Sequence, residues 1–285
     1  MNWAVPVFFM ITGALLLNPE KMITASDCVF KYCRRIVLAL LIFGIPFAVL
    51  RLVMETGIVA FSLLPLSVKA VLENQSLAHL WYLYVLIGIY LVLPVLRWFV
   101  AKAENKEVWL VITALIVTDF VIPLINNVFR LNIAFDIPLK YAVLYVLLGW
   151  YLNKADMKRY RKYCLILMGS LTAVIWGLNY TVKNAAVWTS YNSPLILLLA
   201  ITVFVIFKET DVRQTQWLWN VDRLCFAVYL IHPVFIQFTY RFLKITPTNE
   251  LYPVVTLLFF VVFLIAAFVG SWVLNKIKPL KKYVL

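Results

Sequence analysis

The chain has 285 residues, of which 64% are hydrophobic and only 14% are charged, whereas soluble domains have about 45–50% apolar and about 25% charged residues. This composition excludes an ordinary soluble enzyme and indicates an integral membrane protein. The net charge of +13 does not indicate nucleic-acid binding, because the basic residues stand in short loops between apolar runs, which is the pattern of topology signals.

Nine apolar stretches are candidate membrane spans, since about 17–25 mostly apolar residues cross a bilayer. They lie at about residues 2–17, 36–54, 79–96, 108–125, 139–152, 164–182, 194–207, 224–243 and 254–275. Residues 55–78 are the longest stretch expected to be irregular. The runs lack the strict alternation of barrel strands. The sequence therefore predicts an all-α fold, a polytopic transmembrane helical bundle that forms one membrane domain over residues 1–285.

The basic residues alternate between the loops of this predicted bundle. Most of the 26 basic residues fall in loops 18–35, 97–107, 153–163 and 208–223 and in the C-terminal tail. The positive-inside rule then predicts a cytoplasmic C-terminus, and nine spans put the N-terminus outside. We expect a multi-pass protein of the cell inner (plasma) membrane. No charged segment precedes the first span, so that span does not have the form of a signal peptide.

Histidine occurs twice in the chain, and histidine alone titrates near neutral pH without help from its surroundings. His79 stands at the outer start of a span and carries out proton transfer or, alternatively, belongs to an interfacial aromatic belt with Trp81, Tyr82 and Tyr84. At a helix N-terminus the dipole disfavours the imidazolium, so a neutral His79 is expected to accept a proton.

His232 stands near the middle of a predicted span and is followed by Pro233. Proline frees a backbone carbonyl within a helix, and a histidine at bilayer depth indicates a functional site. The alternative is a packed histidine that is bonded to a neighbouring helix. Tyr229, three residues earlier on the same helical face, is expected to share the polar pocket.

Other polar residues within or beside the spans have less specific interpretations. Asp119 either pairs with a basic group or makes a structural hydrogen bond, and Arg51 is spaced to pair with Glu55. Arg34 and Arg35 either anchor the next span on the cytoplasmic side or bind phosphate groups, because arginine presents a fork of donors that fits them.

Metal and nucleotide signals are weak in this sequence. The four cysteines, Cys28, Cys33, Cys164 and Cys225, match no zinc or haem spacing, and a reducing cytoplasmic side predicts no disulfide. No metal site is expected. A Walker motif and a repeated acidic relay are absent from the sequence, which argues against an ATP-driven pump and a proton-coupled transporter.

Five motifs occur in order along the chain: Val5–Gly13 (VPVFFMITG), Lys31–Pro46 with its two arginines, His79–Leu83 (HLWYL) with Tyr90 and Pro94, Tyr145–Leu152 (YVLLGWYL), and Cys225–Pro233 (CFAVYLIHP). Together they resemble the acyltransferase-3 family, the integral membrane O-acyltransferases of surface polysaccharides. The resemblance covers essentially the whole chain, in order. It is closest to the single-domain branch that acylates lipid-linked or polymeric surface sugars.

The resemblance implies a ten-helix membrane domain that takes an acyl group from cytoplasmic acyl-CoA. The group, usually acetyl and sometimes succinyl, passes to a hydroxyl of a cell-surface or lipid-linked saccharide, as in O-acetylation of the cell envelope. Such chemistry needs a base and cationic groups for the CoA phosphates. Under this resemblance His232, His79 and Tyr229 are the catalytic candidates, Arg34 and Arg35 the candidates for binding acyl-CoA, and membrane lipids and the glycan the remaining partners.

The chain departs from the family pattern at its start. The family's first helix carries an arginine and a histidine treated as catalytic, and no segment here matches it. The nine predicted spans agree with the absence of one inside-to-outside helix, so the domain is expected to be N-terminally incomplete. Either the start codon is misassigned, or the gene is truncated and its product is a poor catalyst. A transporter or export component for lipid or polysaccharide, and an inactive acyltransferase remnant, are the alternative functions.

Overall fold

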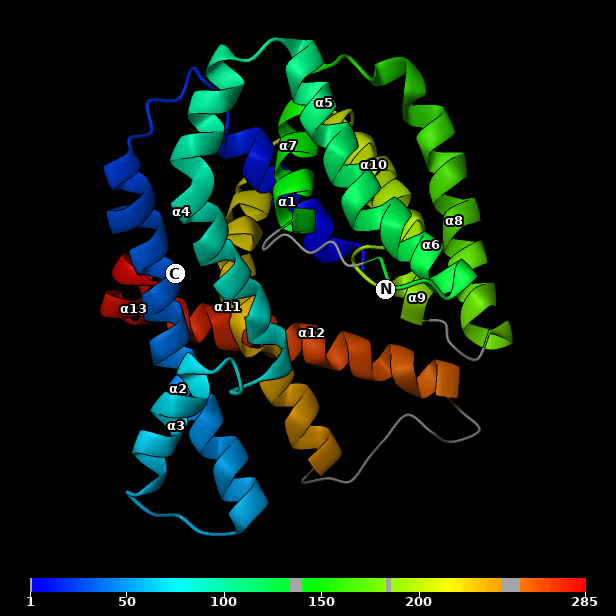
Figure 1. Cartoon of the computed structure of the whole chain (residues 1–285). Coiled ribbons are helices and arrows are strands. Elements are labelled where there is room, and N and C mark those ends of the chain that lie inside the picture. Colours follow the sequence, from blue (N-terminus) through cyan, green and yellow to red (C-terminus); the bar gives the residue numbers. More distant parts are fainter. Residues whose placement is uncertain (1, 134–139, 183–185, 242–251) are drawn as a thin grey trace. The chain divides into compact units, whose positions relative to one another are not determined.

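The structure is a computed structural model that describes residues 2–133, 140–182, 186–241 and 252–285, and every regular element in these ranges is helical (Figure 1). The prediction of an all-α fold is thereby confirmed. The helices form two compact units, each built from two separate segments of the chain. Unit 1 comprises Met1–Cys33 and Val85–Val212, and unit 2 comprises Arg34–Tyr84 and Arg213–Leu285.

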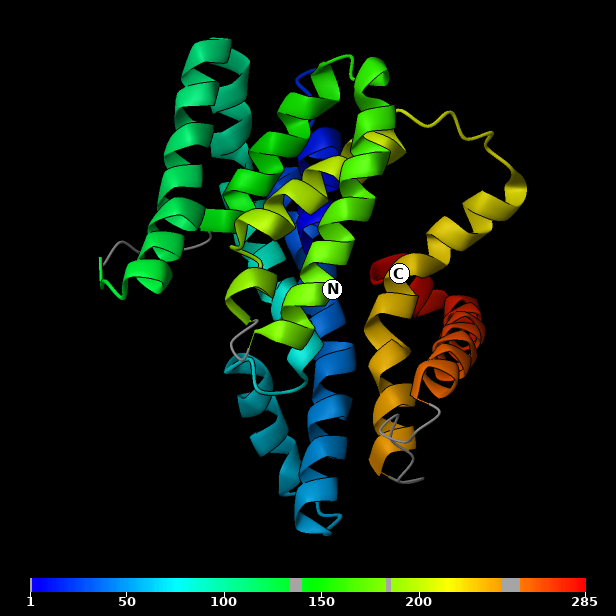
Figure 2. The ribbon, with the colours of Figure 1, turned by 90° about the vertical axis from the view of Figure 1, so that its right-hand side faces the viewer.

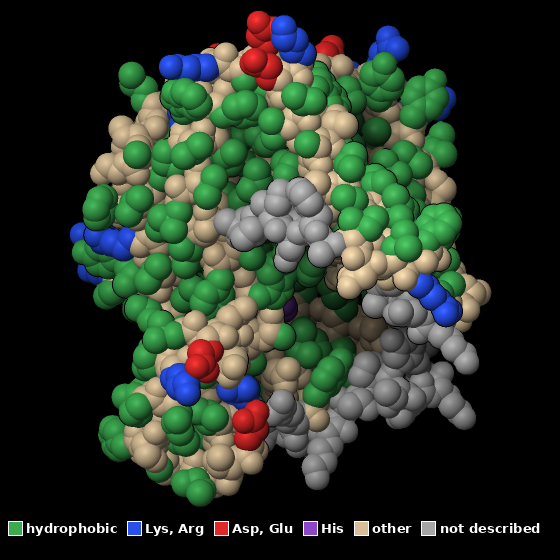
Figure 3. Space-filling view, viewed as in Figure 1, with side chains coloured by type: hydrophobic (Ala, Val, Ile, Leu, Met, Phe, Trp, Pro, Cys, Tyr) green, Lys and Arg blue, Asp and Glu red, His purple; other side chains and the backbone are tan. Residues whose placement is uncertain are grey.

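Six helical stretches in the described part of the chain are long and apolar enough to cross a membrane. They are Asp27–Thr56, Ala78–Lys102, Asn105–Phe129, Lys158–Thr181, Gln216–Tyr240 and Val255–Lys276. Each coincides with a predicted span, although residues 242–243 of one prediction lie outside the described residues. On the face shown in Figure 3, hydrophobic side chains predominate and charged ones are few, as expected for a surface that contacts lipid.

The other three predicted spans are shorter helices. They are α1 (Ala4–Leu16), α7 (Lys140–Lys154) and α10 (Pro194–Lys208), with 13, 15 and 15 residues. At 1.5 Å per residue these helices are about 20–23 Å long, less than the ~30 Å hydrocarbon core of a bilayer. Six of the nine predicted spans are thus helices long and apolar enough to cross a membrane, while residue 139, the predicted start of one of the short spans, lies outside the described residues.

The core of unit 1 is the packing of α1 on α7, with α10 against α1 and against α8 (Arg161–Thr181) (Figures 1 and 2). Two glycines permit the α1–α7 contact. A Cβ atom at Gly13 would lie 1.8 Å from the Val146 carbonyl oxygen, and one at Gly149 would lie 2.0 Å from that of Met10. Small residues let helix backbones approach closely in membranes, so these two motif glycines set the distance between the helices.

The C-terminus of α1 is tied to α4 (Trp81–Lys102) by one arginine. Arg97 donates hydrogen bonds to the carbonyl oxygens of Leu16, Asn18 and Lys21. The last carbonyls of a helix have no partner within the helix, and a cation there also interacts favourably with the helix dipole. Arg97 therefore has a structural role beyond the topology signal expected from its loop.

Several further helices of unit 1 follow α4. They are α5 (Asn105–Ile116), the π-helix Val117–Val121, α6 (Ile122–Phe129) and the short α9 (Ala186–Thr189). The start of α5 is a capping box formed by Glu104 and Glu107. At the start of α10, Ser193 accepts a hydrogen bond from the Leu195 amide, and Pro194 occupies the first helical position.

Unit 2 contains two helix pairs, α2 (Arg34–Thr56) with α3 (Leu63–Leu72) and α11 (Gln216–Arg241) with α12 (Tyr252–Lys276) (Figure 1). The short helix α13 (Lys278–Tyr283) follows α12. The prediction of an irregular stretch over residues 55–78 is wrong, because α3 lies within it. Its 10 residues are too few for a span, but Ala70 and Val71 pack against Ala48 of α2 and bury its apolar face.

Candidate active site

The two histidines lie next to each other in unit 2. His79 is in the 3₁₀ turn Ala78–Leu80 that leads into α4, and His232 is in the middle of α11. Their ring centroids are 5.6 Å apart. The sequence places them more than 150 residues apart and indicates no pairing, so this contact is a product of the fold.

Tyr229 joins the two histidines. Its hydroxyl donates a 2.6 Å hydrogen bond to the carbonyl oxygen of His79, and its ring centroid is 5.5 Å from the His79 ring. On the other side, Tyr82 contacts the Tyr229 ring at 5.7 Å. The structure therefore brings together the three predicted catalytic candidates, although their catalytic role stays a prediction.

Pro233 determines the orientation of the His232 ring. Proline has no amide hydrogen, so the carbonyl of Tyr229, four residues earlier, loses its usual helical donor. Nδ1 of His232 lies 2.8 Å from this oxygen and 3.2 Å from the carbonyl oxygen of Val228. A carbonyl oxygen only accepts, so Nδ1 carries the hydrogen. In the neutral ring, Nε2 then has the free lone pair that a general base requires.

The Nε2 atom of His79 is buried and has no hydrogen-bond partner among the residues that the structure describes. Phe47 of α2 covers the other side of this ring, at 6.4 Å between centroids. A buried polar atom without a partner costs about 1–3 kcal/mol. Such an atom beside a second histidine is a candidate for contact with substrate. Phe47 is not identifiable from the sequence, because a phenylalanine within an apolar span has no distinguishing signal.

Arg34 and Arg35 stand at the N-terminus of α2, and Arg35 also reaches α11. The Arg35 guanidinium lies 5.4 Å from the Phe226 ring centroid, and its Nε donates a 2.7 Å hydrogen bond to the Val284 carbonyl oxygen. Arg34 lies 5.7 Å from the ring of Tyr283. Phe226 precedes His232 by six residues, or about 9 Å of helix. Phosphate binding by the two arginines stays a prediction.

Asp119 and Arg51, the other polar residues that the sequence analysis discusses within the spans, each have at least one partner. Asp119 is buried in the π-helix and accepts a 3.0 Å hydrogen bond from the Thr118 hydroxyl, in agreement with the structural alternative for this residue. Arg51 pairs with Glu55 at 3.8 Å, as their spacing predicts. The four cysteines are free thiols. Within the described ranges, no group of three or more His, Cys, Asp or Glu side chains is placed to hold a metal ion.

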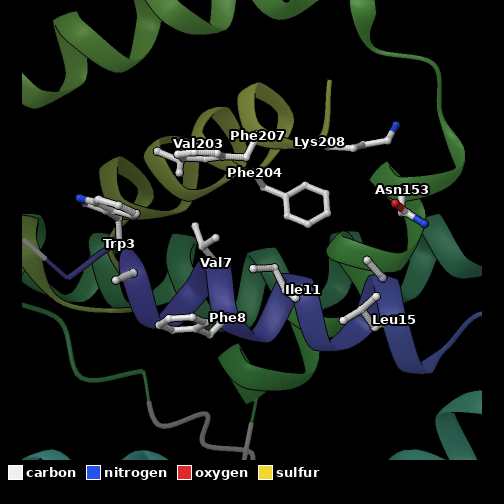
Figure 4. Close-up of a pocket in the computed structure, with 12 residues that line it drawn as sticks. Trp3, Val7, Phe8, Ile11, Leu15, Asn153, Val203, Phe204, Phe207 and Lys208 are labelled. Carbon is white, nitrogen blue, oxygen red and sulfur yellow. The ribbon is translucent and has the colours of Figure 1, made fainter. Parts of the chain in front are cut away.

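Unit 1 contains a cavity of about 440 Å³ between α1 and α10. Trp3 stands at one end, and Asn153 and Lys208 stand at the other (Figure 4). The walls between them are apolar, and neither histidine lines the cavity. The ammonium group of Lys208 already has partners, because it donates hydrogen bonds to the carbonyl oxygens of Leu152 and Ala155. This cavity therefore offers space for an apolar group but no base.

The fold and the cluster define a multi-pass helical membrane protein with a paired-histidine site. A family model described as an acyltransferase domain, that of the acyltransferase-3 family, matches residues 1–276. The chain belongs to this family, and it is a membrane acyltransferase. Neither the curated proteins nor the solved structures contain a match.

Proposed function

We propose that this acyltransferase moves an acyl group from cytoplasmic acyl-CoA to a hydroxyl of a cell-surface or lipid-linked saccharide. Acetyl is the expected group and succinyl the alternative. The observation that carries the proposal is the histidine pair, in which Pro233 and Tyr229 hold His232 with Nε2 as its hydrogen-bond acceptor. A base with a fixed tautomer is what activation of a poorly acidic sugar hydroxyl requires.

His232 is the proposed general base. Its Nε2 takes the proton of the acceptor hydroxyl while the hydroxyl oxygen attacks the carbonyl carbon of the thioester. The C–S bond then breaks, the acyl group stays on the sugar oxygen as an ester, and the CoA thiolate receives the proton. The buried Nε2 of His79 lies on the adjacent ring, where it contacts substrate during this transfer.

Acyl-CoA is the proposed donor, with Arg34 and Arg35 as the groups that hold its phosphates. The positive-inside rule supports a cytoplasmic position for both arginines and for the C-terminus, in the cell inner (plasma) membrane. The Arg35–Phe226 contact supports the same assignment, because it places a cation about 9 Å along α11 from His232. A metal ion has no part in the proposed reaction.

The test is acyl transfer by purified protein in lipid nanodiscs. Radiolabelled acetyl-CoA is supplied with a saccharide extract, and both CoA release and label on the glycan are measured. We expect His232→Ala to lower glycan labelling at least 100-fold, since general-base catalysis typically contributes 10²–10⁴-fold. Arg35→Ala is expected to raise the KM for acetyl-CoA. Lys106→Ala, which removes an exposed cation paired with Glu104, is the control and keeps full activity.

Two results would overturn this assignment. Full activity of both His232→Ala and Arg35→Ala, at normal membrane abundance, would contradict the proposed site. In a separate experiment the purified protein is reconstituted into proteoliposomes. Movement of lipid or glycan across their membrane without consumption of acyl-CoA would contradict the proposed reaction and favour transport.

A further inference from the structure

A small cavity lies beside the histidine pair in unit 2. Its volume is about 40 Å³, enough for one or two water-sized groups. It is lined by Phe47, Leu50, Arg51 and Met54 of α2, by Leu77, and by Val234 and Gln237 of α11. Phe47 also contacts the His79 ring, at 6.4 Å between centroids, so the same side chain lines this cavity and packs against His79.

Arg51 brings an incompletely paired charge to this cavity. Its Nε atom is buried and has no hydrogen-bond partner within the described part of the chain. Glu55 approaches only the NH1 nitrogen, at 3.8 Å, and its side chain is 49% exposed. A long, exposed ion pair of this kind contributes little. The guanidinium therefore keeps donors for a further anionic partner. Gln237 of α11 also lines the cavity, and an amide side chain offers both a donor and an acceptor.

The position of Arg51 along α2 distinguishes it from the arginines proposed to bind CoA. Arg51 follows Arg35 by 16 residues, or about 24 Å of helix, which is most of the thickness of a bilayer core. If Arg35 lies at the cytoplasmic side, Arg51 lies toward the opposite face, where the acceptor arrives. Phe47 and Arg51 are four residues apart and share a helical face, so the backbone position of Arg51 is about 6 Å, or one helical turn, further along α2 than that of Phe47.

We infer that Arg51 and Gln237 form a subsite for an anionic oxygen group of the acceptor, either a carboxylate on a sugar or a phosphate on a lipid-linked saccharide. The inference rests on the proposed function, because it names the acceptor class of that site. Arg51 is one helical turn from Phe47, which contacts His79. We therefore expect the anionic group on the acylated sugar itself or on the neighbouring residue of the acceptor. A neutral acceptor would leave the buried Nε atom of Arg51 without a partner, which carries a cost, although the Arg51 side chain as a whole is 28% exposed.

Binding of defined probes to the whole chain in nanodiscs tests the inference. Glucuronate is compared with glucose, and farnesyl diphosphate with farnesol, by isothermal titration calorimetry. We expect one anionic probe to bind at least tenfold more tightly than its neutral counterpart. Preference for glucuronate identifies a carboxylate, and preference for farnesyl diphosphate identifies a phosphate. Arg51→Gln removes the preference, and Arg51→Lys retains part of it, since lysine keeps the charge but not the fork.

A matched control exists within the same unit. Lys69 pairs with Glu73 at 3.8 Å and four residues apart, as Arg51 does with Glu55, but its side chain is 69% exposed. Lys69→Gln therefore loses the same charge and is expected to keep the anion preference. Anionic probes that bind no better than neutral ones, or an unchanged preference in a folded Arg51→Gln variant, would overturn the inference.

The outcome is separable from that of the proposed function. His232→Ala is expected to lose acyl transfer but to bind the anionic probe as the unaltered protein does. Arg51-dependent binding without any CoA release from the unaltered protein would refute the transfer reaction and leave the anion subsite standing. Acyl transfer whose acceptor KM does not change in Arg51→Gln would refute the subsite and leave the reaction standing.

Discussion

Replacing Gly13 by alanine is expected to separate α1 from α7. The added Cβ would lie 1.8 Å from the Val146 carbonyl oxygen and 2.7 Å from its carbonyl carbon. Both obstructing atoms belong to the backbone, so no side-chain rotation relieves the overlap and the helices must move apart by about 1 Å. Overpacking of this kind typically lowers the free energy of unfolding by about 1–3 kcal/mol. We expect Gly13→Ala at the upper end of this range, because backbone atoms cannot rotate away as a side chain can. A cost of ~3 kcal/mol lowers the melting temperature by about 5 °C for a chain of this length.

The assay is thermal unfolding of the detergent-solubilised protein, followed by size-exclusion chromatography of the fraction that survives heating. Gly177→Ala in α8 is the matched control, because no atom lies within 4 Å of its Cβ position, and alanine favours the helix by up to about 1 kcal/mol. The two substitutions are thus expected to change the melting temperature in opposite directions. Equal melting temperatures of Gly13→Ala and Gly177→Ala would refute the close α1–α7 contact.

Three further predictions concern the histidine pair and the end of α10. Pro233→Ala restores an amide hydrogen that competes for the Tyr229 carbonyl oxygen, so His232 loses its fixed orientation. The kcat for acyl transfer should then fall about tenfold or more at unchanged protein abundance. An unchanged kcat would contradict this reasoning. Tyr229→Phe removes a hydrogen bond to the turn that holds His79. The loss should lower the free energy of unfolding by about 1 kcal/mol and should change kcat more than KM. A variant with the stability and the kcat of the unaltered protein would contradict this prediction. The hydrogen bond from Lys208 lowers the pKa of Glu209 below its ordinary value of 4.5, so the stabilisation is present above that value and is lost as pH falls through the folded pKa. The melting temperatures of Glu209→Gln and of the unaltered protein should therefore converge as pH is lowered below 4.5. A difference that does not shrink on acidification would be the contrary result.

Several properties of the protein are predicted by local sequence alone. Apolar runs such as 36–54 and 254–275 predict helices because backbone groups in lipid must be satisfied within the segment. The pair Arg51–Glu55 follows from its spacing on one helical turn. The ordered motifs indicate the acyltransferase-3 family, which the match over residues 1–276 confirms. Each of these inferences depends on composition or on short-range periodicity.

Short elements are harder to predict from the sequence. The helix α3 is not predicted because 10 residues do not make a span, although packing on α2 stabilises the helix. Three short segments are predicted as membrane spans, and they form helices of 13–15 residues. Hydrophobicity measures the transfer of a segment out of water. A segment that packs against another helix and one that contacts lipid are therefore equally hydrophobic, and the sequence does not distinguish them.

The sequence by itself determined that the protein is helical, that it belongs in a membrane, and which residues could carry a proton. Only the tertiary structure decided that His79 and His232 share one site, with Tyr229 bonded to the turn that carries His79 and the Pro233-freed carbonyl holding His232. Helix formation is a property of neighbouring residues, whereas the meeting of α11 with the turn before α4 depends on the packing of helices far apart in the chain. A histidine beside aromatics has the same local pattern whether it faces lipid or a second histidine.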